Sequence, residues 1–168
     1  MNTNKHVTFN DLNYHSQLAF LKDSPSLEII EQASMSQYAD VRDAVARLPV
    51  TPFNILVKML KYTTSLELAE NIFEHPNFDK TSPVIKELSK SDYYYVRQLI
   101  ATSDETPSEL LDEMLELETD EDVITSIINN PNFSNKCHQK DIFNILMNLE
   151  DRKTDYVEAF LEIKNFLK

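Results

Sequence analysis

Apolar residues recur three and four positions apart in short runs along the chain, with polar residues between them. The clearest runs are Ile55, Leu56, Met59 and Leu60, and then Leu110, Leu111, Met114 and Leu115. Residues at this spacing lie on one face of an α-helix. Each run therefore predicts an amphipathic helix with one buried stripe.

A second set of apolar positions repeats at a period of about 27 residues, a length typical of repeat proteins. Its markers are Val41, Leu68, Val96 and Val123, which are evenly spaced to within one position, each followed by apolar residues four and five positions later. The prolines agree, because Pro49 and Pro76 are one such period apart and Pro131 follows two periods after Pro76. The two independent markers together predict a repeat architecture.

Each repeat is expected to hold two helices. The first opens at a Ser-Pro or Thr-Pro pair (24–25, 51–52, 82–83, 106–107), with the hydroxyl as N-cap and the proline in the first turn. The second ends before a proline, at Leu48, His75 or Asn130. Two residues after His75 and Asn130, Asn77 and Asn132 are expected to take the left-handed backbone geometry that glycine usually supplies.

The fold class predicted from these patterns is all-α: a short right-handed α-solenoid of about four two-helix repeats. Stacked neighbours would complete the core, because a two-helix unit of this size cannot bury both stripes alone. One domain over 1–168 is expected, with an N-terminal cap (1–23), repeats (24–134) and C-terminal capping helices (135–168). The capping helices are expected at about 10–22, 138–149 and 154–167.

Residues 38–52 (YADVRDAVARLPVTP) and 94–107 (YYVRQLIATSDETP) resemble the repeats of the leucine-rich repeat variant family and its HEAT-like relatives. Those repeats read roughly Val-Arg-x-x-Val-Ala-x-x-Pro-x-Thr-Pro. The resemblance implies a binding scaffold. It also implies a ladder of arginine–aspartate pairs, which is partial here because Arg42 and Arg97 are present while Ala69 and Ile124 stand at the other two positions.

The chain of 168 residues contains no glycine. Gly-rich phosphate loops, dinucleotide fingerprints, nucleophile elbows and calcium loops all need a residue without a Cβ atom. Tight hairpins favour glycine as well, which argues against an all-β fold. No cofactor is expected.

The formal net charge is −12, which disfavours direct binding to nucleic acid or to an anionic membrane. Cys137 is the single cysteine, so neither a disulfide nor a thiolate metal cage is expected. No apolar run approaches the length of a membrane span, and the first residues lack the apolar core of a signal peptide. These features together predict a cytoplasmic protein.

Nothing in the sequence predicts catalysis. The four histidines (His6, His15, His75, His138) lack zinc-binding spacing, and Cys137 and His138 are adjacent, so they would point apart on a helix. His75 takes the place of Leu48 and Asn130 in the repeat, which indicates a structural residue at a helix end. A non-enzymatic protein without a small-molecule substrate is therefore expected.

Residues 104–122 hold ten Asp or Glu residues, and no Lys or Arg occurs from 98 to 135. One interpretation is a solvated outer helix face, opposite the apolar stripe. The other is a docking patch for a basic partner, since like charges four residues apart repel. The sequence fits both interpretations. A metal site at 120–122 is disfavoured because consecutive helical residues diverge.

The triplet Tyr93-Tyr94-Tyr95 also admits two interpretations. Tyr93 aligns with Tyr38 and is expected to pack. Tyr94 should share a helix face with Arg97 and Gln98, a composition typical of an interface anchor. The alternative is that it lies over a neighbouring repeat.

The resulting hypothesis is a protein-binding module that grips a basic protein partner across the face formed by the second helices, such as an inhibitor or an immunity protein. The candidate contacts are Arg42, Asp43, Arg47, Glu70, Glu74, Tyr94, Arg97, Gln98, Glu109, Asp112, Glu113, Glu116, Glu121 and Asp122. The alternatives are a nucleic-acid-associated HEAT-like protein, an enzyme, and a structural subunit of a larger assembly.

Overall fold

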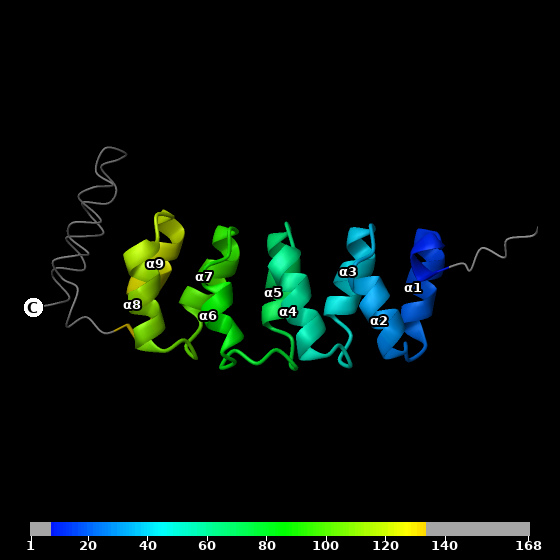
Figure 1. Cartoon of the computed structure of the whole chain (residues 1–168), viewed down its shortest axis with the longest axis horizontal. Helices are drawn as coiled ribbons and strands as arrows, with labels where there is room; N and C mark the ends of the chain where they lie inside the picture. Colours follow the sequence, from blue (N-terminus) through cyan, green and yellow to red (C-terminus); the bar gives the residue numbers. More distant parts are fainter. Residues whose placement is uncertain (1–7, 134–168) are drawn as a thin grey trace, which may run out of the picture. The chain divides into compact units, whose positions relative to one another are not determined.

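A computed structural model describes residues 8–133, which belong to the first of two units into which the chain divides, Met1–Phe133. Regular structure within residues 8–133 is entirely helical, without a strand (Figure 1). This confirms the all-α prediction for that part of the chain. Outside the described residues lie the expected helices at 138–149 and 154–167, together with His6, Cys137 and His138. The prediction of a single domain stays a prediction.

The helices agree closely with the runs of apolar residues. They are a short 3-10 helix η1 (Phe9–Asp11), α1 (Tyr14–Lys22), α2 (Leu27–Ser34), α3 (Ala39–Ala46), α4 (Phe53–Tyr62), α5 (Leu66–Phe73), α6 (Val84–Leu88), α7 (Tyr94–Thr102), α8 (Ser108–Leu117) and α9 (Glu121–Asn129). The expected N-terminal helix at about 10–22 is thus divided into η1 and α1.

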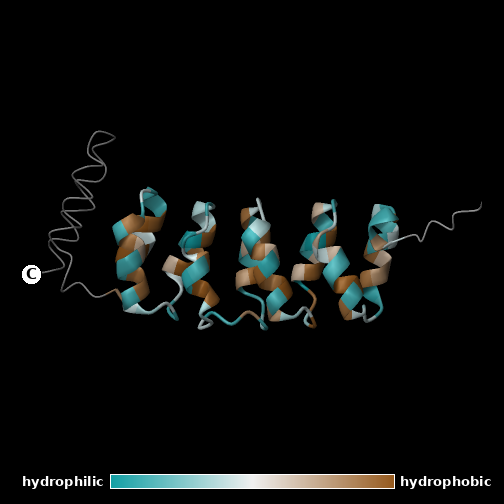
Figure 2. Ribbon diagram, viewed as in Figure 1, coloured by the Kyte–Doolittle hydropathy of each residue, from teal (hydrophilic) through white to brown (hydrophobic). Residues whose placement is uncertain are grey.

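The helices pack in consecutive pairs, α2 with α3, α4 with α5, α6 with α7 and α8 with α9 (Figure 1). The second helix of each pair also contacts the second helix of the next pair, from α3 to α5, α7 and α9. Hydrophobic and hydrophilic residues share each helix (Figure 2). The apolar residues in the stripes of the paired helices are mostly buried. Ile72, Ile100 and Ile127 are fully buried, as the repeated markers predict.

The prediction that Thr51 and Thr106 cap the following helix is wrong. The N-caps are Pro52 for α4 and Pro107 for α8. Both threonines are buried, and each hydroxyl donates a 2.6 Å hydrogen bond to the preceding helix, from Thr51 to the Val45 carbonyl and from Thr106 to that of Ile100. Carbonyls in the last turn of a helix lack partners within the helix. Each threonine hydroxyl therefore donates to such a carbonyl and does not cap the helix that follows.

The other two proline pairs also differ from the prediction. Ser26, not Ser24, caps α2, and its hydroxyl accepts from the N–H of Ile29. Ser24 has φ of 49°, the only positive φ among the described residues. At α6 the N-cap is Pro83, with no capping side chain. The hydroxyl before a proline therefore does not mark the helix start in this chain.

The prediction of left-handed backbone at Asn77 and Asn132 is also wrong, since neither has positive φ. Their side-chain amides instead donate hydrogen bonds to carbonyls in the loop of the preceding helix pair. Asn77 Nδ2 donates to the carbonyls of Pro49 (2.8 Å) and Thr51 (3.0 Å). Asn132, the equivalent residue two helix pairs further along, donates to the carbonyls of Asp104 and Thr106 at 2.6 and 3.0 Å.

His75 has the structural position that the repeat predicts. Its ring is buried, Nε2 lies 2.8 Å from the Leu48 carbonyl, and Nδ1 accepts from the N–H of Asn77 at 3.0 Å. Because Nδ1 accepts, Nε2 carries the hydrogen in this arrangement. Asn130, at the equivalent place after α9, donates to the carbonyls of Ala101 and Ser103. Both side chains thus join successive helix pairs.

Candidate functional site

Two candidate contact residues on and just after α3, Asp43 and Arg47, interact with α5. Asp43 accepts a 2.8 Å hydrogen bond from the amide of Asn71 and forms a 3.0 Å ion pair with Arg47. Arg47 also lies 3.4 Å from Glu67. Its side chain is 58% exposed, so these pairs contribute little to stability and leave the guanidinium accessible to a partner.

The candidates on and after α5 lie at its solvent face. Glu70 is exposed, and Glu74, the C-cap, forms a 2.9 Å ion pair with Lys80. The Lys80 ammonium also lies 4.8 Å from the centre of the Phe73 ring, within reach of a cation–π interaction. Glu74 is thus an exposed carboxylate whose charge is compensated by Lys80 of the same chain.

The three tyrosines before and within α7 have different environments. Tyr94 is 43% exposed, and its ring meets the edge of the Tyr95 ring with 5.5 Å between ring centres, so both interpretations of Tyr94 stay open. Tyr95 is buried, and its hydroxyl donates a 3.0 Å hydrogen bond to the Thr63 carbonyl. Tyr93 is half-buried and stacks on Tyr95 with 5.6 Å between ring centres, so it packs as predicted. The sequence did not indicate the buried role of Tyr95, because the equivalent position holds Asp40.

Arg97 is held in a buried ion pair with Glu118. The guanidinium binds the carboxylate through two hydrogen bonds, from Nε at 2.7 Å and from Nη2 at 2.9 Å, and Nη1 donates to the Ser91 carbonyl at 2.7 Å. Only 17% of the Arg97 side chain and 4% of the Glu118 side chain are exposed. This engagement gives Arg97 a structural role, and Gln98 beside it is half-buried.

The same pair controls the ionisation of Glu118. Burial by itself would raise the pKa of this carboxyl, but the hydrogen bonds from Arg97 and from the backbone N–H groups of Asp120 and Thr119 outweigh burial. The pKa of Glu118 is therefore lowered, and the ion pair stays charged at neutral pH.

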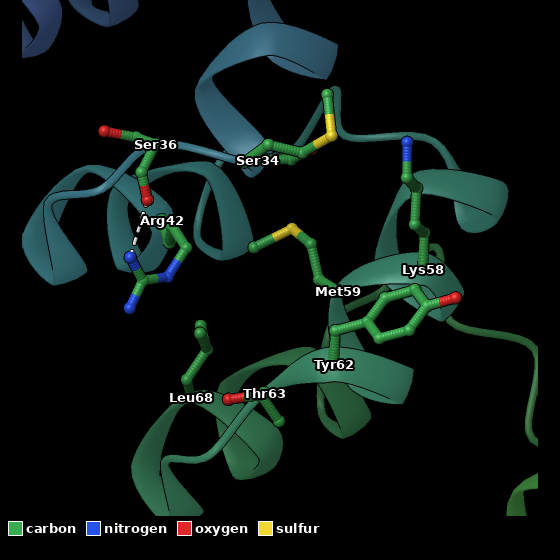
Figure 3. Close-up of a pocket in the computed structure, with 9 residues that line it drawn as sticks. Ser34, Ser36, Arg42, Lys58, Met59, Tyr62, Thr63 and Leu68 are labelled. Atoms are coloured by element: carbon green, nitrogen blue, oxygen red, sulfur yellow. Dashed lines mark hydrogen bonds between the residues drawn. The ribbon is translucent and has the colours of Figure 1, made fainter. Parts of the chain in front are cut away.

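Arg42 lies in a groove of about 410 Å³ between the α2–α3 pair and the α4–α5 pair (Figure 3). Its Nη1 donates a 2.6 Å hydrogen bond to the Ser36 carbonyl. Among residues 8–133 its guanidinium makes no ion pair with a carboxylate. The groove is lined by Ser34, Met35, Ser36, Arg42, Lys58, Met59, Tyr62, Thr63 and Leu68, which include two cations and no acid.

A second groove, of about 280 Å³, contains Arg97. It is lined by Ser89, Lys90, Ser91, Arg97, Glu113, Met114, Leu117 and Glu118. This groove carries two cations and two carboxylates, so its charges balance.

The acidic segment 104–122 divides into structural and exposed carboxylates. Glu118 pairs with Arg97, and Asp120 caps α9 by accepting from the N–H groups of Asp122 and Val123. Glu113 lies 2.7 Å from Lys86, whose hydrogen bond lowers the pKa of this carboxyl.

The remaining acidic candidates differ in exposure. Glu109, Glu116 and Asp122 are exposed, whereas Asp112 and Glu121 are half-buried. Glu121 and Asp122 also lie in the first turn of α9, where a negative charge stabilises a helix. Glu109 and Glu116 of α8 and Asp122 of α9 are therefore the most accessible of these remaining candidates.

Within residues 8–133 no group of three or more His, Cys, Asp or Glu side chains is arranged to hold a metal ion. The helices of this region are all too short or too polar to span a bilayer. In comparisons with known proteins, no family model matches the chain, and no curated protein or solved structure matches it significantly. The resemblance to HEAT-like repeats therefore stays a prediction.

Proposed function

We propose that this chain is a non-enzymatic α-solenoid module that binds a basic protein partner. The binding surface comprises the solvent face of α3, α5 and α7 and the exposed carboxylates of α8. Its contacts are the accessible candidates on those helices, without Arg97, whose guanidinium is already bound to Glu118. Activity as an inhibitor or immunity protein fits a small module of this kind.

The repeated side-chain bonds between helix pairs support the solenoid. His75 reaches a carbonyl 27 residues earlier, and Asn77 reaches carbonyls 26 and 28 residues earlier. Asn130 and Asn132 do the same, over 26 to 29 residues. These separations support two-helix repeats with the period that the sequence predicts, of which α2–α3 to α8–α9 would be four.

The observation that carries the functional proposal is the uncompensated charge of α8. Glu109 and Glu116 are exposed and seven residues apart, which places them on one face of the helix. Lys86 neutralises Glu113 between them, and no Lys or Arg occurs from 98 to 135. A patch of this kind accelerates association with a cationic surface, and its effect weakens with salt.

The proposal places the protein in the cytoplasm. A single cysteine in 168 residues suits a reducing compartment, where disulfides are rare.

The test reverses the charge of the patch. A partner is captured from the native host lysate, identified and purified, and its affinity is measured for the chain with Glu109→Lys and Glu116→Lys. The matched control carries Glu28→Lys and Glu31→Lys, which change the net charge equally at exposed positions of α2. We expect the α8 variant alone to lose about tenfold in affinity, roughly 1.4 kcal/mol. Equal losses in both variants, or affinity independent of salt, would contradict the proposal.

A further inference from the structure

The two grooves are built from equivalent residues. Adding 55 to a residue number of the Arg42 groove gives a residue of the Arg97 groove at eight positions. Four of these equivalences conserve the amino acid: Ser34 and Ser89, Ser36 and Ser91, Arg42 and Arg97, Met59 and Met114. The arginines also make the same bond, because each Nη1 donates to the carbonyl of the serine six residues earlier.

The grooves differ at the position that faces the arginine. In the Arg97 groove this position is Glu118, whose carboxylate occupies the Nε and Nη2 edge of the guanidinium. In the Arg42 groove the equivalent residue is Thr63. Thr63 Oγ1 accepts from the N–H of Ser65 (3.1 Å), just as Glu118 Oε1 accepts from that of Asp120 (2.9 Å). The threonine side chain is too short to bring an acceptor to Arg42 as well.

The lining of the Arg42 groove is also more positively charged than that of the Arg97 groove. Lys58 takes the place of Glu113, so the Arg42 groove contains two cations and no carboxylate. A guanidinium presents paired N–H donors that match the two oxygens of a carboxylate. Because a carboxylate binds Nε and Nη2 of Arg97, we expect a carboxylate to fit the same edge of the Arg42 guanidinium.

The rim of the Arg42 groove indicates where that carboxylate comes from. Met35 is 53% exposed and Tyr62 is 75% exposed, while Met59 is buried at the base. Exposed aromatic and methionine side chains next to an arginine are typical of protein interfaces. A free small acid would leave this apolar rim in water, whereas a partner segment with a neighbouring apolar side chain would cover it.

We propose that the Arg42 groove binds the carboxylate of a glutamate on the protein partner, next to an apolar side chain that packs on Met59 and Tyr62. The inference rests on the proposed function only in taking the occupant to be a protein. A partner with a basic surface facing α8 can also present such a carboxylate to Arg42.

The probe is the capped dipeptide acetyl-Glu-Leu-amide, titrated into the isotope-labelled full-length protein. Binding is followed by NMR at the Arg42 Nε–Hε and Met59 methyl signals, and the Arg97 signal serves as an internal reference because its site is filled. We expect saturable shifts at Arg42 and Met59, a dissociation constant of about 1–10 mM for so small a ligand, and no shift at Arg97. Acetyl-Gln-Leu-amide should bind at least tenfold more weakly.

Thr63→Glu tests the geometry, because it supplies the carboxylate that Glu118 supplies to Arg97. We expect this variant to abolish peptide binding. Thr64→Glu is the matched control, since Thr64 is exposed and adjacent, and it should retain at least half of the wild-type affinity. If Thr63→Glu does not fold, Arg42→Gln replaces it, with the Met59 methyl signal as the readout.

Three outcomes would overturn the inference: no response of Arg42 to the capped glutamate, equal binding of the glutamine peptide, or unchanged binding in the Thr63→Glu or Arg42→Gln variant. Inorganic phosphate that binds tighter than the peptide would also overturn it, because the site would then be a general anion site. None of these readouts involves Glu109 or Glu116. Failure here is therefore distinguishable from failure of the charge-reversal experiment.

Discussion

At the residue scale, the buried pair of Arg97 and Glu118 gives the most specific consequence. Removing one member of such a pair leaves an uncompensated charge out of water. Glu118→Gln should therefore lower the free energy of unfolding by about 3 kcal/mol at pH 7. Glu116→Gln, two residues away and exposed, should change it by no more than about 0.5 kcal/mol.

The pH dependence of that difference has a defined sign. The pKa of Glu118 in the folded protein is lowered from the ordinary value of 4.5. Its charged form therefore stabilises the folded state above pH 4.5, and this contribution is lost as the pH falls through the lower folded pKa. Urea unfolding at pH 7, 4.5 and 3 should show the wild type and Glu118→Gln converging in acid. A constant difference would contradict the assignment.

The sequence predicted the buried residues better than the polar ones. The four repeated apolar markers all lie in the core, because hydrophobic spacing determines which helix face is buried. The Arg97–Glu118 pair was not predicted. Glu118 belongs to a run of acids whose members look alike in sequence, and only the packing of the groove at α7 and α8 distinguishes it.

At the scale of the helix, the threonines before Pro52 and Pro107 explain why the predicted caps were wrong. A hydroxyl can accept at the start of one helix or donate at the end of another. The buried carbonyls of Val45 and Ile100 decide between these roles, and they become neighbours of the threonines only in the folded chain. Local sequence rules therefore placed the N-caps of α4 and α8 within one residue but did not predict the hydrogen bonds of the two threonines.

Thr106 provides a test of this connection between α7 and α8. Thr106→Val keeps the shape of the side chain but leaves the Ile100 carbonyl without its 2.6 Å partner. We expect a loss of about 1 kcal/mol in unfolding free energy, the net value of a typical hydrogen bond, because the Ile100 carbonyl keeps the N–H of Ser103 at 3.2 Å. Thr106→Ser retains the hydroxyl and should recover most of that loss. If thermal and urea unfolding show Thr106→Val to be more stable than Thr106→Ser, the hydrogen bond is not the stabilising feature.

At the scale of the whole described region, equivalences two helix pairs apart are closer than those one pair apart. Both grooves, both Thr–carbonyl bonds and both bridging asparagines recur after two pairs. The polar contacts and grooves thus recur over twice the interval of the apolar stripes. The sequence markers alone favoured the shorter period because every pair needs the same apolar stripe, whatever its loops and grooves contain.

Because each helix pair contacts mainly the neighbouring pairs, a destabilising substitution in one pair should have a local effect. Leu56 is fully buried in α4, which contacts α2 and α5. Leu56→Ala should cost about 3 kcal/mol by leaving a cavity. Amide hydrogen exchange should accelerate most in α2, α4 and α5, and least in α9, because each repeat is stabilised mainly by its neighbours. Leu111→Ala, at the equivalent position of α8, is the matched control and should accelerate exchange in α8 and α9 instead. Equal acceleration from α1 to α9 in both variants would mean one cooperative core, and the solenoid proposal would then be wrong.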